Sequence, residues 1–209
     1  MLFQAQPTMT RIATASHRDR IAHRTSGLGV LFEQLVRGRK YSILDLGPAL
    51  GINIDFWSQI PCKIYIQDFY RSLRAPGVFP PEEGVSCESV FDKFLPAEPD
   101  VHVDIILCWD LLNYFKPSEI EGLARCLSRH CQRGTLLFTL VSSLPQIPAE
   151  PITFRILDRT QLIYEIHTQA VIPAPRYLVR DIIRLMSGFQ VLGSFLLRNG
   201  FQEHLLSYR

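Results

Sequence analysis

The sequence predicts an α/β domain, in which strands and helices alternate and a sheet is covered on both faces. An apolar run that starts at Ser42 ends in the acidic residue Asp45, and the chain then turns through two glycines and enters an amphipathic stretch at 52–60. A second run, at 103–108, is almost wholly apolar, as expected for a strand buried on both faces. Strand, helix and strand then recur up to residue 141, which predicts a right-handed parallel crossover.

The composition is that of one globular domain without unusual partners. The chain has 209 residues, of which 47% are hydrophobic and 20% charged, enough for one substantial core. A formal net charge of +2 is too small to indicate a nucleic-acid surface. No charge-free apolar run approaches the roughly 18 residues of a membrane span, and no signal peptide pattern is present. Five cysteines without a Cys-x-x-Cys pair indicate free thiols in the cytoplasm and no metal site. The oligomeric state stays open.

Residues 1–25 are polar and basic, which predicts a flexible or loosely docked arm in front of a single domain at 26–209. The alternatives are an arm that folds over the site and completes it, or an organelle transit peptide. The domain is expected to begin with a helix at 27–37, whose apolar residues recur at helical spacing and which Gly38 ends.

The turn that follows the strand at 42–46 is the first candidate ligand site. It contains Asp45, Gly47 and Gly51, and a glycine turn at the carboxyl edge of a parallel sheet lets a ligand approach bare backbone. Asn53 is the expected cap of the next helix, and Pro61 ends it. The alternative is that the glycines serve only to pack the helix on the strand.

A second strand, at 63–67, ends in Asp68, 23 residues after Asp45. Nucleotide-binding sheets place an acidic residue at about this spacing, where its carboxylate accepts hydrogen bonds from two ribose hydroxyls. Asp68 could instead cap the next helix, and the two roles can coexist. The connector at 74–81 is rich in turn residues and shows no convincing third strand, and a short helix is expected at 88–95.

The strand at 103–108 ends in Trp109 and Asp110, which should emerge beside the turn after Asp45. Asp110 could orient an acceptor or cap the turn at 111–115. Asn113 and Tyr114 are further candidate substrate contacts. Ser118 and Glu121 form an expected capping box for a helix whose buried stripe ends at Leu127.

The last third of the sequence predicts an insertion hairpin and a C-terminal hairpin. Two short strands around 150–168 read as an insertion hairpin over the catalytic edge. Arg155, Tyr164 and His167 of this hairpin could face a substrate, or simply form its exposed face, and His167 is the best general base by its chemistry. A helix at 179–186 precedes two strands that flank Asn199-Gly200, a strong hairpin signal.

These motifs carry a family resemblance over residues 28–209. Asp45-x-Gly47-x-x-x-Gly51 resembles motif I of the class I S-adenosylmethionine-dependent methyltransferases, with Ala49 where a middle glycine is usual. The stretch at 104–114 is similar to their fourth-strand region, and the tail at 193–203 resembles that of a bacterial group of methyltransferase-like proteins.

The resemblance implies a three-layer Rossmann-like fold with a seven-stranded sheet, six strands parallel and one antiparallel from the C-terminal hairpin. It implies S-adenosylmethionine as the cofactor and a set of site residues. The expected cofactor contacts are Asp45, Gly47, Ala49, Gly51, Asp68, Trp109 and Asp110. Asp110 and His167 are the expected catalytic residues, and Trp109 could attract the sulfonium cation.

The implied activity is in-line transfer of a methyl group to an acceptor, expected to be a small molecule. Such chemistry needs alignment and exclusion of water more than an acid or a base. One alternative is a methyltransferase-like protein that no longer catalyses and acts in binding or assembly, because Pro48 and Ala49 could crowd the donor. A nicotinamide-dependent oxidoreductase is a second alternative, which the missing Gly-x-Gly-x-x-Gly disfavours.

Overall fold

The computed structural model describes residues 21–96 and 101–209, and its centre is a mixed sheet of six strands. The strand order is β10-β11-β5-β4-β2-β3. The neighbours β3 and β2, β2 and β4, and β4 and β5 are parallel, whereas β11 is antiparallel to both β5 and β10. The bounds are β2 Tyr41–Asp45, β3 Cys62–Ile66, β4 Val103–Trp109, β5 Cys131–Ser142, β10 Phe189–Leu196 and β11 Phe201–Tyr208.

The α/β class is confirmed, but the predicted count of seven strands is wrong. Between β3 and β4 the described residues form only helices, namely α3 (Phe69–Leu73), α4 (Cys87–Phe91) and the 3₁₀ turn η1 (Asp92–Phe94). The Ser86 hydroxyl caps α4 by accepting a hydrogen bond from the Ser89 amide at 3.2 Å. The turn-rich connector thus leads into a capped helix, and β3 is left as an edge of the sheet.

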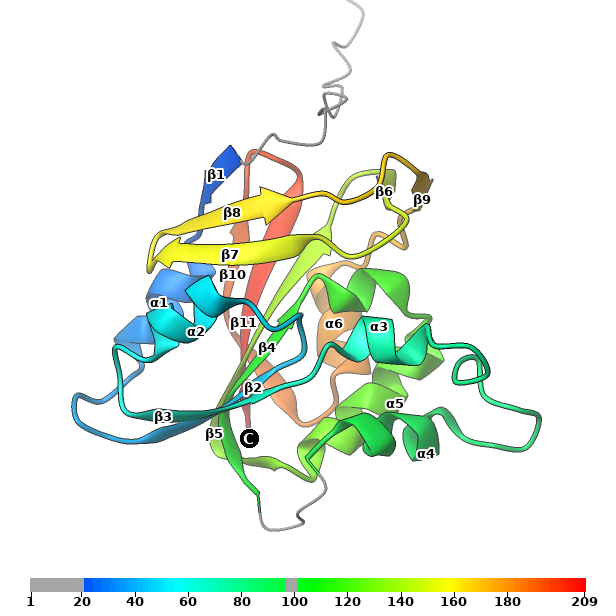
Figure 1. The fold of residues 1–209 in the computed structure, drawn as a ribbon, viewed down its shortest axis with the longest axis horizontal. Coiled ribbons are helices and arrows are strands. Elements are labelled where there is room, and N and C mark those ends of the chain that lie inside the picture. The colour runs from blue at the N-terminus through cyan, green and yellow to red at the C-terminus, as the bar shows by residue number, and fades with distance from the viewer. Residues whose placement is uncertain (1–20, 97–100) are drawn as a thin grey trace, which may run out of the picture.

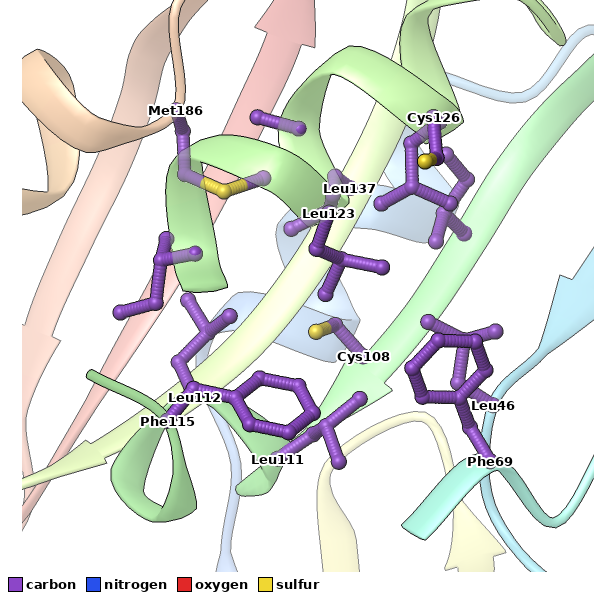
Figure 2. Close-up of a cluster of buried hydrophobic side chains, with 14 of the residues drawn as sticks. Leu46, Phe69, Cys108, Leu111, Leu112, Phe115, Leu123, Cys126, Leu137 and Met186 are labelled. Carbon is purple, nitrogen blue, oxygen red and sulfur yellow. The ribbon is translucent and has the colours of Figure 1, made fainter. Parts of the chain in front are cut away.

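Helices cover the two faces of the sheet. Figure 1 shows α1 (Gly27–Glu33) and α2 (Gly51–Trp57) on one side, and α4, α5 (Pro117–Ser128) and α6 (Val179–Leu185) on the other. Figure 2 shows part of the core under α5, where Leu123 and Cys126 lie over Cys108 and Leu137 of the sheet. Helix α5 begins one residue earlier than its expected cap, because Pro117 takes the first helical position and Lys116 N donates to Glu119 Oε2 at 2.7 Å.

A second, three-stranded sheet lies across the upper ends of the central strands in Figure 1. Its order is β1-β8-β7, with β1 Ile21–Arg24, β7 Thr153–Asp158 and β8 Gln161–Glu165, all antiparallel. Strands β7 and β8 fall within the segment expected to be an insertion hairpin. Strand β1 belongs to the segment expected to be an arm, of which residues 1–20 lie outside the described part.

Asn53 fixes the hairpin to α2, and its expected role as a helix cap is wrong. The residue at the cap position is Leu50, and Asn53 is buried one turn further on. Asn53 Nδ2 donates to the Phe154 carbonyl at 2.9 Å, and Asn53 Oδ1 accepts from the Ile156 amide at 2.8 Å. The side-chain amide therefore satisfies one carbonyl and one amide of the edge strand β7.

The remaining elements close the structure. Strands β6 (Gln146–Pro148) and β9 (Val171–Pro173) form a small antiparallel pair, and η2 (Leu111–Tyr114) follows β4. The expected C-terminal hairpin is present, and Gly200 at its turn has a φ of +84°. No helix within residues 21–96 and 101–209 has the length and apolar character needed to cross a membrane.

Candidate functional site

A cavity of about 630 Å³ lies at the carboxyl ends of β2, β3 and β4, beneath the segment that leads into β7. Its volume is within the range of sites that bind small molecules and cofactors. Leu46, Gly47, Pro48 and Leu50 line it from the glycine turn, and residues 108–111 line it from the end of β4. Residues 149–154 form the opposite wall.

The cavity brings together five of the residues expected to form the site and leaves out three. Gly47, Asp68, Trp109, Asp110 and His167 line it. The lining does not include Asp45, Ala49 or Gly51. Ala49 is exposed, and Gly51 is the first residue of α2 with no atom within 4 Å of where a Cβ would lie.

Asp45 shapes the turn from inside the protein. Its Oδ1 accepts hydrogen bonds from the Gly47 amide at 2.9 Å and from Trp109 Nε1 at 2.6 Å. The pKa of Asp45 is raised to about 6, mainly because the side chain is buried. The two hydrogen bonds oppose this rise, and the negative charge of Asp68 adds a smaller contribution to it. The two carboxylates are thus near enough to interact, but only Asp68 reaches the cavity.

Gly47 lies directly against the indole of Trp109. A Cβ at position 47 would lie 2.8 Å from Trp109 Cδ1 and 2.9 Å from Trp109 Nε1, closer than real side chains approach. Packing inside the chain therefore requires a glycine here, but the packing partner is the Trp109 indole and not the helix that the alternative interpretation named. A ligand that approaches the Gly47 backbone has to share that space with the indole.

Trp109 has an unusual backbone conformation, and both its ring and its carbonyl make specific contacts. Its φ is +49°, in the left-handed region, which costs a non-glycine residue about 1–3 kcal/mol and is commonest at functional sites. The indole stacks on Phe154 with 5.4 Å between ring centroids and an interplanar angle of 6°. Thr139 Oγ1 donates to the Trp109 carbonyl at 2.8 Å. The ring thereby connects the glycine turn to the hairpin wall.

Asp68 is the N-terminal cap of α3, as the helix-capping alternative expected. Its Oδ1 accepts from the Arg71 amide, 3.3 Å away. The same side chain lines the cavity, so the cap and a contact to a ligand are compatible. Its role in holding ribose stays a prediction.

Asp110 is a buried carboxylate in the cavity wall. It is only 2% exposed, and its Oδ2 accepts from the Ile152 amide at 3.0 Å. Its side chain makes no capping bond to η2, so the helix-cap interpretation is wrong. Burial raises the pKa of Asp110 to about 7, which suits a group that takes up a proton near neutral pH.

The hairpin supplies one of the three expected contacts. His167 is exposed, lines the cavity, and has its Nε2 2.7 Å from Thr153 Oγ1. Arg155 is instead paired with Glu165, Nε to Oε2 at 2.7 Å. Tyr164 is buried with its ring 4.8 Å from that of Phe154. Neither Arg155 nor Tyr164 lines the cavity.

Two tyrosines fasten the wall, and sequence patterns did not reveal that role. Tyr114 Oη donates to the Glu150 carbonyl at 2.8 Å, and Tyr70 Oη donates to the Ala149 carbonyl at 3.4 Å. Tyr114, expected to contact substrate, thus holds the loop. Asn113, with the same expectation, is buried and donates to the Asp110 and Leu140 carbonyls.

Comparison with solved structures finds methyltransferases of similar fold. A glycopeptide N-methyltransferase, MtfA, complexed with S-adenosyl-L-methionine has a TM-score of 0.46 and 12% identity, over 88% of this chain and 94% of that one. A S-adenosylmethionine-dependent methyltransferase from Clostridium acetobutylicum has a TM-score of 0.49 and 12% identity, over 85% and 87%. A TehB-like methyltransferase from Corynebacterium glutamicum has a TM-score of 0.47 and 11% identity, over 88% of each chain.

No protein-family model and no curated protein matches the chain. The case for a function therefore rests on the residues of the cavity.

Proposed function

We propose that the chain is an enzyme that transfers a methyl group from S-adenosylmethionine to a small-molecule acceptor. One observation carries this proposal: a glycine turn, a carboxylate after β3 and a buried carboxylate after β4 converge on one cavity. Parallel α/β sheets bind ligands at this edge, outside the carboxyl ends of their strands. The small net charge favours a small molecule over a nucleic acid as the acceptor.

The cavity suits the nucleoside half of this cofactor. Asp68 lines the wall with a carboxylate, of which the helix cap uses Oδ1, so lone pairs remain for the vicinal ribose hydroxyls. The side chains of Leu46, Leu50 and Ile152 supply apolar lining. When bound, the cofactor supplies an electrophilic methyl group on a sulfonium, whose positive charge a nearby carboxylate favours.

Asp110 is the residue placed to handle the acceptor's proton. Its carboxyl is fixed by the Ile152 amide and lines the cavity. A pKa near 7 allows the ionised form to take a proton from a hydroxyl or ammonium group of the acceptor at neutral pH, which leaves a nucleophilic oxygen or amine nitrogen. His167, at the exposed side of the cavity beside Thr153, is the second candidate base.

The wall at 149–152 excludes water from the reacting groups. Tyr70 and Tyr114 hold its carbonyls, and the two rings meet edge to face at 5.2 Å. Methyl transfer benefits from this arrangement because it depends on alignment and a dry site.

A methyltransferase-like protein that no longer binds the cofactor, and acts instead in the binding or assembly of a partner, is the second candidate. The indole against Gly47 favours it, because that indole stands where the turn would meet a ligand. A nicotinamide cofactor on the same sheet is a third candidate.

Isothermal titration with S-adenosylmethionine, S-adenosylhomocysteine, NAD and NADP separates the three functions. Saturable binding of the two sulfur nucleosides alone supports the proposal. Binding of NAD or NADP alone points to an oxidoreductase, and no binding by millimolar concentrations supports the assembly role. Asp68→Ala is the site variant, and Asp55→Ala, an exposed acid on α2, is its control.

A further inference from the structure

We infer that Trp109 is a shutter that admits a nucleoside to the cavity but keeps a long 5′ substituent off the Gly47 turn until the indole moves. This inference rests on the proposed function. It makes Trp109 a residue that determines which adenosine compounds the site accepts, in place of the sulfonium contact expected from the sequence.

The first step is the direction in which a bound nucleoside must lie. If Asp68 holds the ribose hydroxyls, the group on the 5′ side points to the glycine turn after β2, as the pyrophosphate does in dinucleotide-binding sheets. In S-adenosylmethionine and S-adenosylhomocysteine that group carries the amino-acid end. Its approach to bare backbone is what a glycine in such a turn usually permits.

The second step is that the indole already occupies one side of Gly47, the side on which a Cβ would lie. The indole edge lies so close to Gly47 that even a methyl group there would meet Cδ1 at 2.8 Å. Trp109 is only 5% exposed and still lines the cavity. The cavity of about 630 Å³ exists with the indole in this position, so a nucleoside finds room without any movement.

The third step is that the closed position is specifically held. Trp109 Nε1 donates to Asp45 Oδ1 at 2.6 Å, and the ring stacks on Phe154. Phe154 belongs to β7, and its own carbonyl is fixed by Asn53. Hydrogen bonds to carboxylates are among the stronger ones, so breaking this one has a cost. Any ligand that needs the indole to move therefore binds with lower affinity.

Titration of two ligands tests the shutter. Adenosine carries no amino-acid end, whereas S-adenosylhomocysteine does. S-adenosylhomocysteine should bind to Trp109→Ala about tenfold more tightly than to the unmodified chain. The affinity for adenosine should differ by less than about twofold between the two proteins. Trp109→Phe keeps a ring against Phe154 and loses only the Nε1 donor, so it should give a smaller gain for the same ligand.

The outcomes separate the shutter from the proposed function. A parallel change for both ligands, or no gain for S-adenosylhomocysteine in either variant, overturns the shutter and leaves the cofactor site standing. Absence of binding by both ligands to all three proteins overturns the shutter and the proposed function together.

Fluorescence tests the movement itself and needs no loss of the indole. The chain has two tryptophans, so Trp57→Phe leaves Trp109 as the sole reporter. Trp57 is the last residue of α2, is buried and does not line the cavity. Saturating S-adenosylhomocysteine should shift the Trp109 emission to longer wavelength as the indole leaves its buried position, and adenosine should not. Equal shifts with both ligands, or none with either at saturation, contradict the shutter.

Discussion

Gly47→Ala should destabilise the fold, because the added methyl group meets the Trp109 indole. The new Cβ would lie 2.8 Å from Cδ1, 2.9 Å from Nε1 and 3.2 Å from Asp45 Oδ1. Moving the indole away has a cost, since the ring also contacts the Asp45 carboxylate, Phe154 and Phe138. Overpacking costs about 1–3 kcal/mol, and losing a hydrogen bond to a charged group costs about 1.5–3 kcal/mol. The expected loss of unfolding free energy is about 1–3 kcal/mol if the hydrogen bond survives and about 2.5–6 kcal/mol if it is lost as well.

The assay is equilibrium urea unfolding, with Gly51→Ala as the matched control. No atom lies within 4 Å of a Cβ at position 51, and this glycine begins α2. Alanine there should be neutral or stabilising by up to about 1 kcal/mol, because alanine has the higher helix propensity.

A double variant identifies the cause of the loss. Adding Trp109→Ala to Gly47→Ala removes the clash, so the two effects should be clearly less than additive. Equal stability of Gly47→Ala and Gly51→Ala would refute the packing role of Gly47. Strict additivity in the double variant would refute the indole as its cause.

Three further predictions concern ligand and proton binding. Asp68→Ala should weaken S-adenosylmethionine binding by about 1.5–3 kcal/mol in calorimetry, and an affinity equal to that of Asp55→Ala would remove Asp68 from the site. Ala49→Gly should leave that affinity within about twofold, because Ala49 is exposed and outside the cavity lining; a large change would mean that the loop rearranges around the ligand. The pKa of Asp110 is raised to about 7, so its ionised form, and with it the methyl-transfer rate in a pH series, should increase as pH rises from about 6 to 8. Asp110→Asn should flatten that profile, and an unchanged profile would exclude Asp110 as the base.

Much of the fold followed from short-range patterns. The buried strand at 103–108 and the Asn199-Gly200 hairpin were predicted because continuous apolar runs and turn dipeptides act locally. The seventh strand came from the family resemblance alone, and the local sequence at 74–95 forms turns and a capped helix.

The sequence predicted which residues meet at the cavity edge better than it predicted their individual contacts. Gly47, Asp68 and Asp110 were expected at one sheet edge because parallel strands bring their carboxyl ends together. The partners of Asn53 lie 101 and 103 residues away, and Asp45 meets an indole 64 residues away. No local pattern encodes such pairs, so Asn53 was read as a cap and Asp45 as a ligand contact.

Direct titration of S-adenosylmethionine into the unmodified chain and into Asp68→Ala tests the central proposal, a cofactor site between the glycine turn and Asp68. Saturable binding to the unmodified chain, competed by S-adenosylhomocysteine and weakened in the variant, is the predicted result. No binding by millimolar concentrations, or equal affinity in the two proteins, would contradict it.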